Sequence, residues 1–298
     1  MDGSIKVLFI ILNYKTYEET VKLVNELNND GLGDKYILIV DNASPNESYE
    51  VLCNFVAHLD KVEVILSPEN GGFAKGNNFG LRYAKKLKPK YVCIINNDVH
   101  FPISVVDRLC IWYERLPNVA MIAPVQILPN GEKAQFGNMD IPNIWIDMAS
   151  YIPYLSNIIY KNKMDIYSEN TEIEGVHRIG LLPGAFSFVS YNLIEDLGFF
   201  DELTFLFCEE RFFAQKAKKR GLYNYIILNE HYLHQHSMTI SSEASKKKQR
   251  EMMFRERCKY HRQYSKNPRL CCMGLAISFY IGELFETLSR WKGKITQL

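Results

Sequence analysis

The sequence predicts an α/β fold with one mostly parallel central sheet, followed by a C-terminal helical extension. Strand and helix patterns alternate through residues 1–100, which is typical of right-handed crossovers between parallel strands. Each of these strands ends in polar residues, which in a parallel sheet lie along one edge. From Glu243 the chain becomes first basic and then apolar, in two helical segments. We therefore expect one domain over residues 1–240 and a helical tail over 241–298.

The composition is that of an ordinary globular protein of 298 residues, with 47% hydrophobic and 23% charged residues. The net charge of +1 argues against a nucleic-acid binder that relies on bulk electrostatics. Seven cysteines without regular or metal-site spacing favour reduced thiols. The first residues lack a signal-peptide cleavage site, and no stretch reaches the roughly 20 apolar residues of a membrane-spanning helix. We therefore expect a cytoplasmic protein, attached at most to a membrane surface.

The N-terminal elements follow from apolar runs and from helical spacing. We expect helices over Thr16–Leu27, where Thr16 and Glu19 have capping-box spacing, and over about Asn77–Lys86. The strands are expected at Val7–Leu12, Tyr36–Ser44, Val62–Ser67 and in the apolar run from Val92. Their polar ends are Asn13-Tyr14, Asp41-Asn42, Asn70-Gly71-Gly72 and Asn96-Asn97-Asp98. These residues should converge on a single crevice, where open α/β sheets bind their ligands.

The second half is less regular. Residues 138–176 have weak periodicity, which predicts a long, partly ordered excursion. Thr204–Gly221 contains a helix closed by Gly221. The strands are expected at Met121–Leu128, at Leu181–Ser190 with a continuation through residues 192–202, and at Tyr223–Leu228.

The ordered set of motifs resembles family 2 glycosyltransferases of the GT-A fold, especially the rhamnosyltransferase-like enzymes of bacterial surface polysaccharide synthesis. The resemblance covers about Val7 to Ser237, and each motif alone is weak. In order, the motifs are Asn13-Tyr14, Asp41 to Ser44, Asn70 to Asn78, Asn96 to Asp98, Gly184-Ala185-Phe186, Glu209-Glu210 and His234 to Ser237.

The resemblance implies an inverting, metal-dependent glycosyltransferase. A sugar would pass from a UDP- or dTDP-sugar to a glycan or lipid-linked glycan, with Mg²⁺ or Mn²⁺ as cofactor. Residues 1–100 would form the nucleotide-sugar-binding half of the domain, and residues 101–240 the acceptor and catalytic half.

The donor would be held by the first four strand ends. Asp41 could accept a hydrogen bond from the imide N–H of uracil or thymine, and Asn13 and Tyr14 could line the base pocket. Lys75 could meet a phosphate at the glycine-preceded helix start. Asn70, Gly71, Asn77, Asn96 and Asn97 complete the donor set implied by the resemblance. For the individual residues, an ordinary turn, cap or solvated lysine stays open as the alternative.

The metal would be held by the strand end at Asn96 to Asp98, on the two positions of the family's Asp-x-Asp motif. Asn96 departs from the motif, so Asp98 is left as the main carboxylate, an oxygen ligand suited to Mg²⁺ or Mn²⁺. His234 fits the His-x-x-Ser spacing, and His236 is the competing candidate. A turn aspartate and a structural histidine are the alternatives.

Catalysis would rest on Glu210, which falls on the family's catalytic Asp and could remove the proton of the acceptor hydroxyl. Glu209 is the second candidate, and acids in a first helical turn also favour the helix dipole. This sequence departs from the family pattern at two positions. Glu210 is one methylene longer than the usual Asp, and Phe212 stands where many members carry a second Asp. Gly184, Ala185 and Phe186 would lie under the acceptor sugar, or form only a turn.

The tail leaves two interpretations open: an interfacial membrane element, or a dimer or core-packing helix. Two other functions also compete with the glycosyltransferase. A sugar nucleotidyltransferase is disfavoured because Asn13 to Thr16 lack a Gly-rich basic signature. A catalytically silent nucleotide-sugar binder remains open because the acidic positions are altered. A glycoside hydrolase is disfavoured because these acids fit metal and nucleotide handling better than a facing pair.

Overall fold

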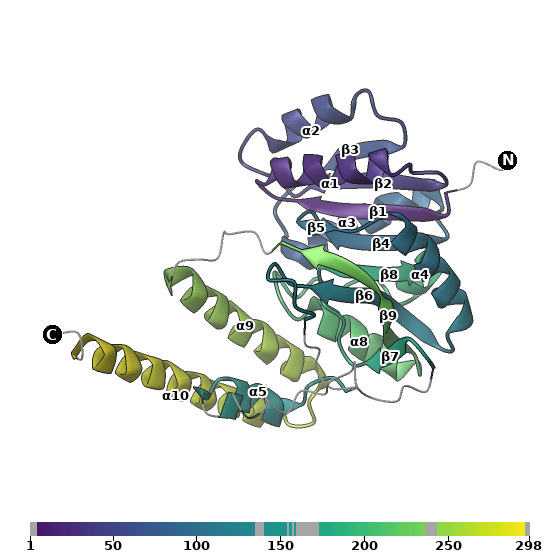
Figure 1. Cartoon of the computed structure of the whole chain (residues 1–298). Coiled ribbons are helices and arrows are strands. Elements are labelled where there is room, and N and C mark those ends of the chain that lie inside the picture. The colour runs from purple at the N-terminus through teal and green to yellow at the C-terminus, as the bar shows by residue number, and fades with distance from the viewer. Residues whose placement is uncertain are drawn as a thin grey trace.

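The computed structural model describes residues 5–134, 140–153, 155–156, 158, 173–235 and 243–295, with the side chains of 247–288 in the last range (Figure 1). The strands are β1 (Val7–Asn13), β2 (Lys35–Asp41), β3 (Val62–Leu66), β4 (Tyr91–Asn96), β5 (Val99–His100), β6 (Val119–Ile127), β7 (Val176–Ile179), β8 (Phe186–Ser190) and β9 (Tyr223–His234). The helices are α1 (Tyr17–Asn29), α2 (Ser48–Val56), α3 (Gly72–Leu87), α4 (Ser104–Arg115), α5 (Ile144–Ser150), α7 (Tyr191–Asp196), α8 (Glu209–Lys219), α9 (Glu243–Tyr264) and α10 (Pro268–Ile295).

The described strands form one sheet in the order β3-β2-β1-β4-β8-β6-β9-β5, with β7 also paired to β9. The pairs from β3 to β4 are parallel, as is β6 with β9, whereas β8, β5 and β7 pair antiparallel with their neighbours. The α/β class is confirmed. The sheet is mixed, because β8 lies antiparallel between β4 and β6, and the parallel arrangement expected from the sequence belongs mainly to the N-terminal half.

The central strands are apolar because both faces of the sheet are covered. Every residue from Val7 to Ile11 is fully buried. Helix α3 packs closely on this part, since a Cβ at Gly76 would lie 2.6 Å from Leu12 Cδ1 and one at Gly80 would lie 2.8 Å from Val40 Cγ2. The register pairs Asn13 with Asp41, and Leu12 with Asn96, so the polar strand ends lie side by side.

Two element predictions were wrong. The continuation of the strand beyond Ser190 is helix α7, because Tyr191 and Ile194 are buried at helical spacing. The capping box at Thr16 does not form: Thr16 makes no side-chain cap bond, and its hydroxyl instead accepts from Asn97 Nδ2 at 2.8 Å.

Two other elements extend beyond their predicted bounds. Helix α3 begins at Gly72, ahead of Asn77, and β9 continues past Leu228 to His234.

The C-terminal helices pack on one another and on the end of the sheet domain. Helix α10 lies along α9 and beside α5, as Figure 1 shows at the lower left. Phe254 of α9 stacks on Phe279 of α10 with ring centroids 4.8 Å apart. Tyr260 of α9 packs edge-on against Phe212 of α8 at 5.4 Å. The tail is therefore joined to the helix that carries Glu209 and Glu210.

One expectation about the tail was wrong. Within the described residues, the 21-residue segment Pro268–Leu288 is long and apolar enough to cross a membrane by length and composition, with a mean hydropathy of 1.3 over an 18-residue window. Its polar residues, among them Ser278 and Glu283, interrupt the run but do not offset the mean hydropathy. All seven cysteines are free thiols in the structure.

Candidate active site

The carboxyl ends of β1 and β2 are joined by a buried hydrogen-bond network. Asn13 Nδ2 donates to Asp41 Oδ2 at 2.8 Å, and the Thr20 hydroxyl donates to Asn13 Oδ1 at 2.9 Å. Asp41 also accepts from the backbone N–H of Ser44 and from its hydroxyl, both at 2.8 Å. Asp41 is fully buried and both of its carboxylate oxygens are occupied, so its carboxylate shapes the turn after β2. Tyr14 is 39% exposed beside this network.

An open cleft of about 510 Å³ lies next to this turn. It is lined by Ala43, Ser44, Leu66, Ser67, Pro68 and Phe79. Apolar walls with an aromatic ring and a few hydroxyls suit a planar heterocycle. These lining residues were not predicted, although Leu66 and Ser67 end a predicted strand and therefore lie at the same sheet edge.

The turn before α3 is built from amide contacts. Asn70 Oδ1 accepts from Asn42 Nδ2 at 3.0 Å and from the N–H of Gly72 at 3.1 Å. Gly72 has φ +82°, and an added Cβ would collide with the Phe205 carbonyl. That carbonyl accepts the N–H of Phe73 at 2.7 Å. The N-terminus of α3 is therefore bonded to the loop that precedes α8.

Lys75 and Asn77, the predicted donor-binding residues within α3, differ in their exposure to solvent. Lys75 forms an exposed ion pair with Glu69, and a Cβ at Gly71 would overlap the Lys75 side chain. Asn77 is buried; its Nδ2 donates to the Phe73 carbonyl at 3.0 Å, and its Oδ1 has no partner. Lys75 therefore lies at the surface, and Asn77 lies inside.

The residues at the end of β4, Asn96 to Asp98, contact three different parts of the protein. The N–H of Asn96 donates to the Ala185 carbonyl at 3.0 Å. Asn97 Nδ2 donates to the hydroxyls of Thr16 and Thr20 at 2.8 and 3.0 Å, which ties β4 to the start of α1. Asp98 lies in a different contact, against the end of β9.

Asp98 Oδ1 lies 3.2 Å from His234 Nε2, although the two residues are far apart in the chain. Gln126 Nε2 lies 3.3 Å from His234 Nδ1, and the Tyr232 hydroxyl donates to Gln126 Oε1 at 3.3 Å. A carboxylate beside an imidazole suits Mn²⁺ or Mg²⁺ with further oxygen ligands. No cluster of three or more His, Cys, Asp or Glu is found within the described ranges, so phosphate and water would complete such a shell. His236 lies outside the described residues.

Glu209 and Glu210 open α8, directly after two non-glycine residues in the left-handed region, Phe207 at φ 75° and Cys208 at φ 67°. Glu209 is 5% exposed, and its Oε2 has no partner. Burial and the neighbouring Glu210 raise the pKa of Glu209 to about 8. Burial also raises the pKa of Glu210, with Arg211 opposing it. A carboxyl group with a pKa of about 8, such as that of Glu209, exchanges protons near neutral pH.

The Gly184 turn faces this acidic pair. A Cβ at Gly184 would lie 3.6 Å from Glu209 Oε1, an ordinary van der Waals contact, so the turn lies directly beside the carboxylate. Ala185 is buried next to it, and the ring of Phe186 packs in the core against Phe101 and Tyr232 at 5.0 and 5.2 Å. Gly184 and Ala185 therefore lie at the turn, and Phe186 supports it from below.

A buried ionic cluster holds α8 against the tail, and the sequence analysis missed it. Arg211 Nη1 lies 2.8 Å from Asp147 Oδ2, and His261 Nε2 lies 2.7 Å from the same oxygen. Burial acts to raise the pKa of Asp147, but His261, Arg211 and Arg257 outweigh it and lower that pKa. Asp147 and His261 follow no motif or period that links them, so no sequence signal predicted the contact.

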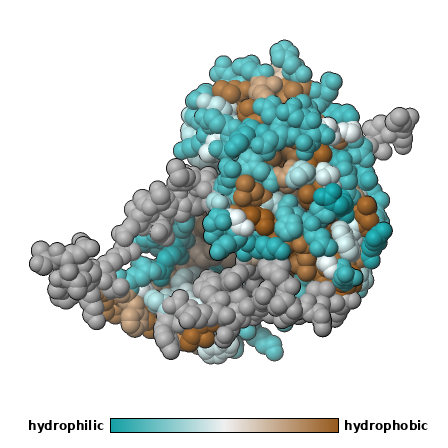
Figure 2. Space-filling model, viewed as in Figure 1, coloured by the Kyte–Doolittle hydropathy of each residue, from teal (hydrophilic) through white to brown (hydrophobic). Residues whose placement is uncertain are grey.

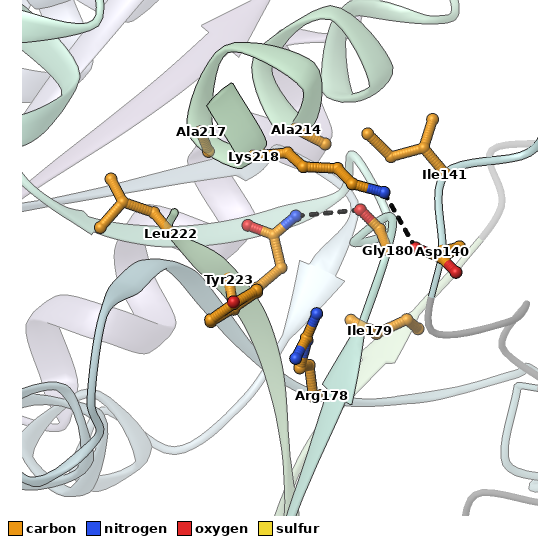
Figure 3. A pocket seen from close by; sticks show the side chains of 11 residues that line it. Asp140, Ile141, Arg178, Ile179, Gly180, Ala214, Ala217, Lys218, Leu222 and Tyr223 are labelled. Atoms are coloured by element: carbon orange, nitrogen blue, oxygen red, sulfur yellow. Dashed lines mark hydrogen bonds and ion pairs between the residues drawn. The ribbon is translucent and has the colours of Figure 1, made fainter. Parts of the chain in front are cut away.

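A small cavity of about 30 Å³ lies between α8 and the start of β9 (Figure 3). Lys218 and Asp140 form an ion pair at 3.0 Å across its rim, and Asn224 Nδ2 donates to the Gly180 carbonyl at 3.2 Å. It has room for water only, and none of the candidate residues lines it.

Residues 8–173 match the family model described as "Glycosyl transferase family 2". The low-salt glycan biosynthesis hexosyltransferase Agl10 of Haloferax volcanii is 25% identical over 215 residues, 72% of this chain and 62% of that protein. The chain thus spans less than two thirds of that relative. The relative is archaeal, so it does not support the bacterial part of the resemblance.

Two solved structures are similar in fold. A mannosyltransferase from Pyrobaculum calidifontis, in complex with GDP-Man and Mn²⁺, has a TM-score of 0.58 at 12% identity, covering 98% of this chain and 81% of that one. GalNAc-T7 with UDP, GalNAc and Mn²⁺ has a TM-score of 0.56 at 11% identity, covering 78% and 44%. The predicted GT-A fold is confirmed.

Proposed function

The chain belongs to glycosyl transferase family 2, and on that premise we propose that it transfers a sugar from a nucleoside-diphosphate donor to a glycan acceptor, with inversion and with a divalent metal. The observation that carries the proposal is the approach of Asp98 to His234 at the edge of the sheet where the polar strand ends meet.

The donor is a UDP- or dTDP-sugar. Its base enters the cleft beside Ala43 and Phe79, next to the turn that Asp41 shapes. Because the Asp41 carboxylate is fully hydrogen-bonded, it acts on the base through the position of this turn. Asn13 stabilises the same turn, and Tyr14 contributes an exposed ring beside it.

Asp98 and His234 hold Mn²⁺ or Mg²⁺ together with the donor diphosphate. When bound, the metal supplies an electrophile that stabilises the negative charge of the departing diphosphate. Gln126 orients the imidazole through its contact with His234 Nδ1 at 3.3 Å, and the Tyr232 hydroxyl in turn orients Gln126 through a hydrogen bond of 3.3 Å. Asn96 supplies a neutral oxygen or amide next to this site, where the family carries an acid.

The Glu209-Glu210 pair removes the proton of the acceptor hydroxyl. Glu210 is partly exposed and takes the proton. Glu209 Oε1 lies beside the Gly184 turn, and the buried, unpartnered Oε2 can accept the hydroxyl's hydrogen bond. Attack on the anomeric carbon from the side opposite the diphosphate inverts its configuration. Burial raises the pKa of both carboxyl groups, that of Glu209 to about 8, which suits proton transfer near neutral pH.

The acceptor is a glycan or a lipid-linked glycan in cell-surface polysaccharide synthesis. The relative named for glycan biosynthesis supports this class, and the free thiols suit a reducing, cytoplasmic location. A second candidate function, a silent nucleotide-sugar binder, is favoured only by the altered acidic positions Asn96, Glu210 and Phe212. A nucleotidyltransferase is not supported by the family.

The test is a thermal-shift panel of UDP, dTDP and GDP, each with and without Mn²⁺, on wild type and Asp98→Ala. We expect metal-dependent stabilisation by one uracil or thymine nucleotide, and loss of that stabilisation in Asp98→Ala. Equal stabilisation of the two proteins, or no stabilisation by any nucleotide, would contradict the proposal.

A further inference from the structure

Helix α10 carries an apolar face that no part of the described chain covers. The residues of this face, here called the α10 stripe, are between 38% and 68% exposed. They are Leu270, Met273, Ile277, Tyr280, Ile281, Leu284, Phe285 and Leu288. At 3.6 residues per turn the stripe is roughly 140° wide, and it runs from Leu270 to Leu288 of α10. Figure 2 shows its brown atoms at the lower left, where α10 lies in Figure 1.

The opposite face of α10 is packed inside the protein. Leu275 and Phe279 are buried with Tyr151 and Cys258. Gly282 lies so close to the Tyr151 carbonyl that a Cβ would collide with it. A helix held in this way against its own domain cannot be surrounded by lipid, so α10 does not span a bilayer while this packing is kept.

No charged residue lies on the stripe. The two acids of this segment, Glu283 and Glu286, both pair with Arg250 of α9. Their charges are thus satisfied inside the helix pair, and the outer face keeps only apolar side chains and the Tyr280 ring. The stripe can therefore enter an apolar medium without carrying a charge into it.

The C-terminal tail is basic, whereas the rest of the chain has an excess of acidic residues. Residues 241–298 contain 13 Lys and Arg against five Glu, whereas residues 1–240 contain 22 Lys and Arg against 29 Asp and Glu. Lys266 and Arg269 lie exposed just before the stripe, and Arg290, Lys292 and Lys294 follow it in the sequence. An apolar face bracketed by cations matches an anionic bilayer surface, where headgroups meet the cations and acyl chains meet the face. A second copy of the chain fits poorly, because two such tails repel each other.

We propose that the α10 stripe docks on anionic phospholipid, with α10 lying in the plane of the membrane surface. This interaction does not depend on the donor or the metal, so it stands or falls separately from the proposed function.

The test is co-sedimentation of the full chain with preformed vesicles. Vesicles of equal parts phosphatidylcholine and phosphatidylglycerol should bind it, vesicles of phosphatidylcholine alone should bind it roughly tenfold less, and high salt should release it. Ile277→Glu with Leu284→Glu places two charges on the stripe and should lower the partition coefficient by about tenfold or more. The matched control is Ile111→Glu on α4, an equally exposed apolar residue that should leave the partition unchanged.

Three results would overturn the proposal. They are no binding to anionic vesicles, equal binding of wild type and the double variant, or a wild-type dimer that the double variant dissociates while vesicle binding persists. If the double variant does not fold, hydrogen exchange of wild type decides: anionic vesicles should slow exchange within residues 270–288, and unchanged exchange there contradicts docking.

Discussion

Gly72→Ala, at the start of α3, should displace the start of α8, the helix that carries Glu209 and Glu210. Gly72 has φ +82°, and its Cα faces the Phe205 carbonyl at a distance that leaves no space for a methyl group. The same carbonyl accepts the N–H of Phe73 at 2.7 Å. The substitution therefore adds backbone strain and displaces the loop that leads through Phe207 and Cys208 to Glu209.

The expected magnitude follows from two contributions. A non-glycine residue in the left-handed region costs about 1–2 kcal/mol. Loss of the Phe73–Phe205 hydrogen bond costs about 1 kcal/mol more. We therefore expect Gly72→Ala to lower the free energy of unfolding by about 2–3 kcal/mol. Because the loop sets the start of α8, turnover should fall as well, by about tenfold or more.

The matched control is Gly131→Ala. Gly131 has nearly the same φ, +84°, and a Cβ there meets nothing within 4 Å, so only the strain remains. Urea unfolding of both variants at one temperature isolates the collision as the difference between them, about 1 kcal/mol or more. Equal loss of stability in the two variants, with full activity in Gly72→Ala, would refute the coupling between α3 and α8.

Three further predictions concern the acids. Glu209→Gln removes a carboxyl whose folded pKa is raised to about 8. Ionisation of this carboxyl destabilises the fold as pH rises from about 4.5 through about 8, so the variant should match wild type at about pH 4 and exceed it by up to about 5 kcal/mol at about pH 9 in urea titrations. A pH-independent difference would contradict this. Glu210→Gln should lower turnover by about 10²-fold or more with little change in donor binding, whereas unchanged turnover would exclude it as the base. Asp147→Ala should lower the free energy of unfolding by about 3 kcal/mol, because Arg211 and His261 lose their buried carboxylate. The control Asp140→Ala should lower it by under about 1 kcal/mol, because its pair with Lys218 is exposed. Similar losses of stability in the two variants would refute a stabilising role for the buried cluster.

The sheet and its polar edge could be predicted because both depend on local signals. Buried parallel strands are continuous apolar runs, and the polar residues that end them must meet at one edge. Asn13 and Asp41 are an example: each ends such a run, and the two side chains are hydrogen-bonded.

The direction of each side chain at that edge could not be predicted. Asp41 ends β2 and Asn97 follows β4. The Asp41 carboxylate is hydrogen-bonded by Ser44 and Asn13, whereas Asn97 donates to Thr16 and Thr20. A one-residue step reverses the face of a side chain, so a motif fixes the neighbourhood but not the partner.

Contacts between segments that are distant in the chain could not be predicted from the sequence either. The Phe205 carbonyl that holds α3, and the Asp147 carboxylate that holds Arg211, join elements that no period or motif connects. The α7 helix was missed for a different reason, because six residues with two buried positions fit a strand and a helix nearly equally well.

The most direct test of the central claim is proton NMR of sugar nucleotides incubated with the enzyme and Mn²⁺, with water as the acceptor. The account predicts slow release of nucleoside diphosphate from a UDP- or dTDP-sugar, with the freed sugar appearing first in the inverted anomeric configuration. Chelation of the metal and Asp98→Ala should each abolish the release. Release that survives chelation, or a freed sugar that first appears with the donor's own configuration, would contradict a metal-dependent inverting glycosyltransferase.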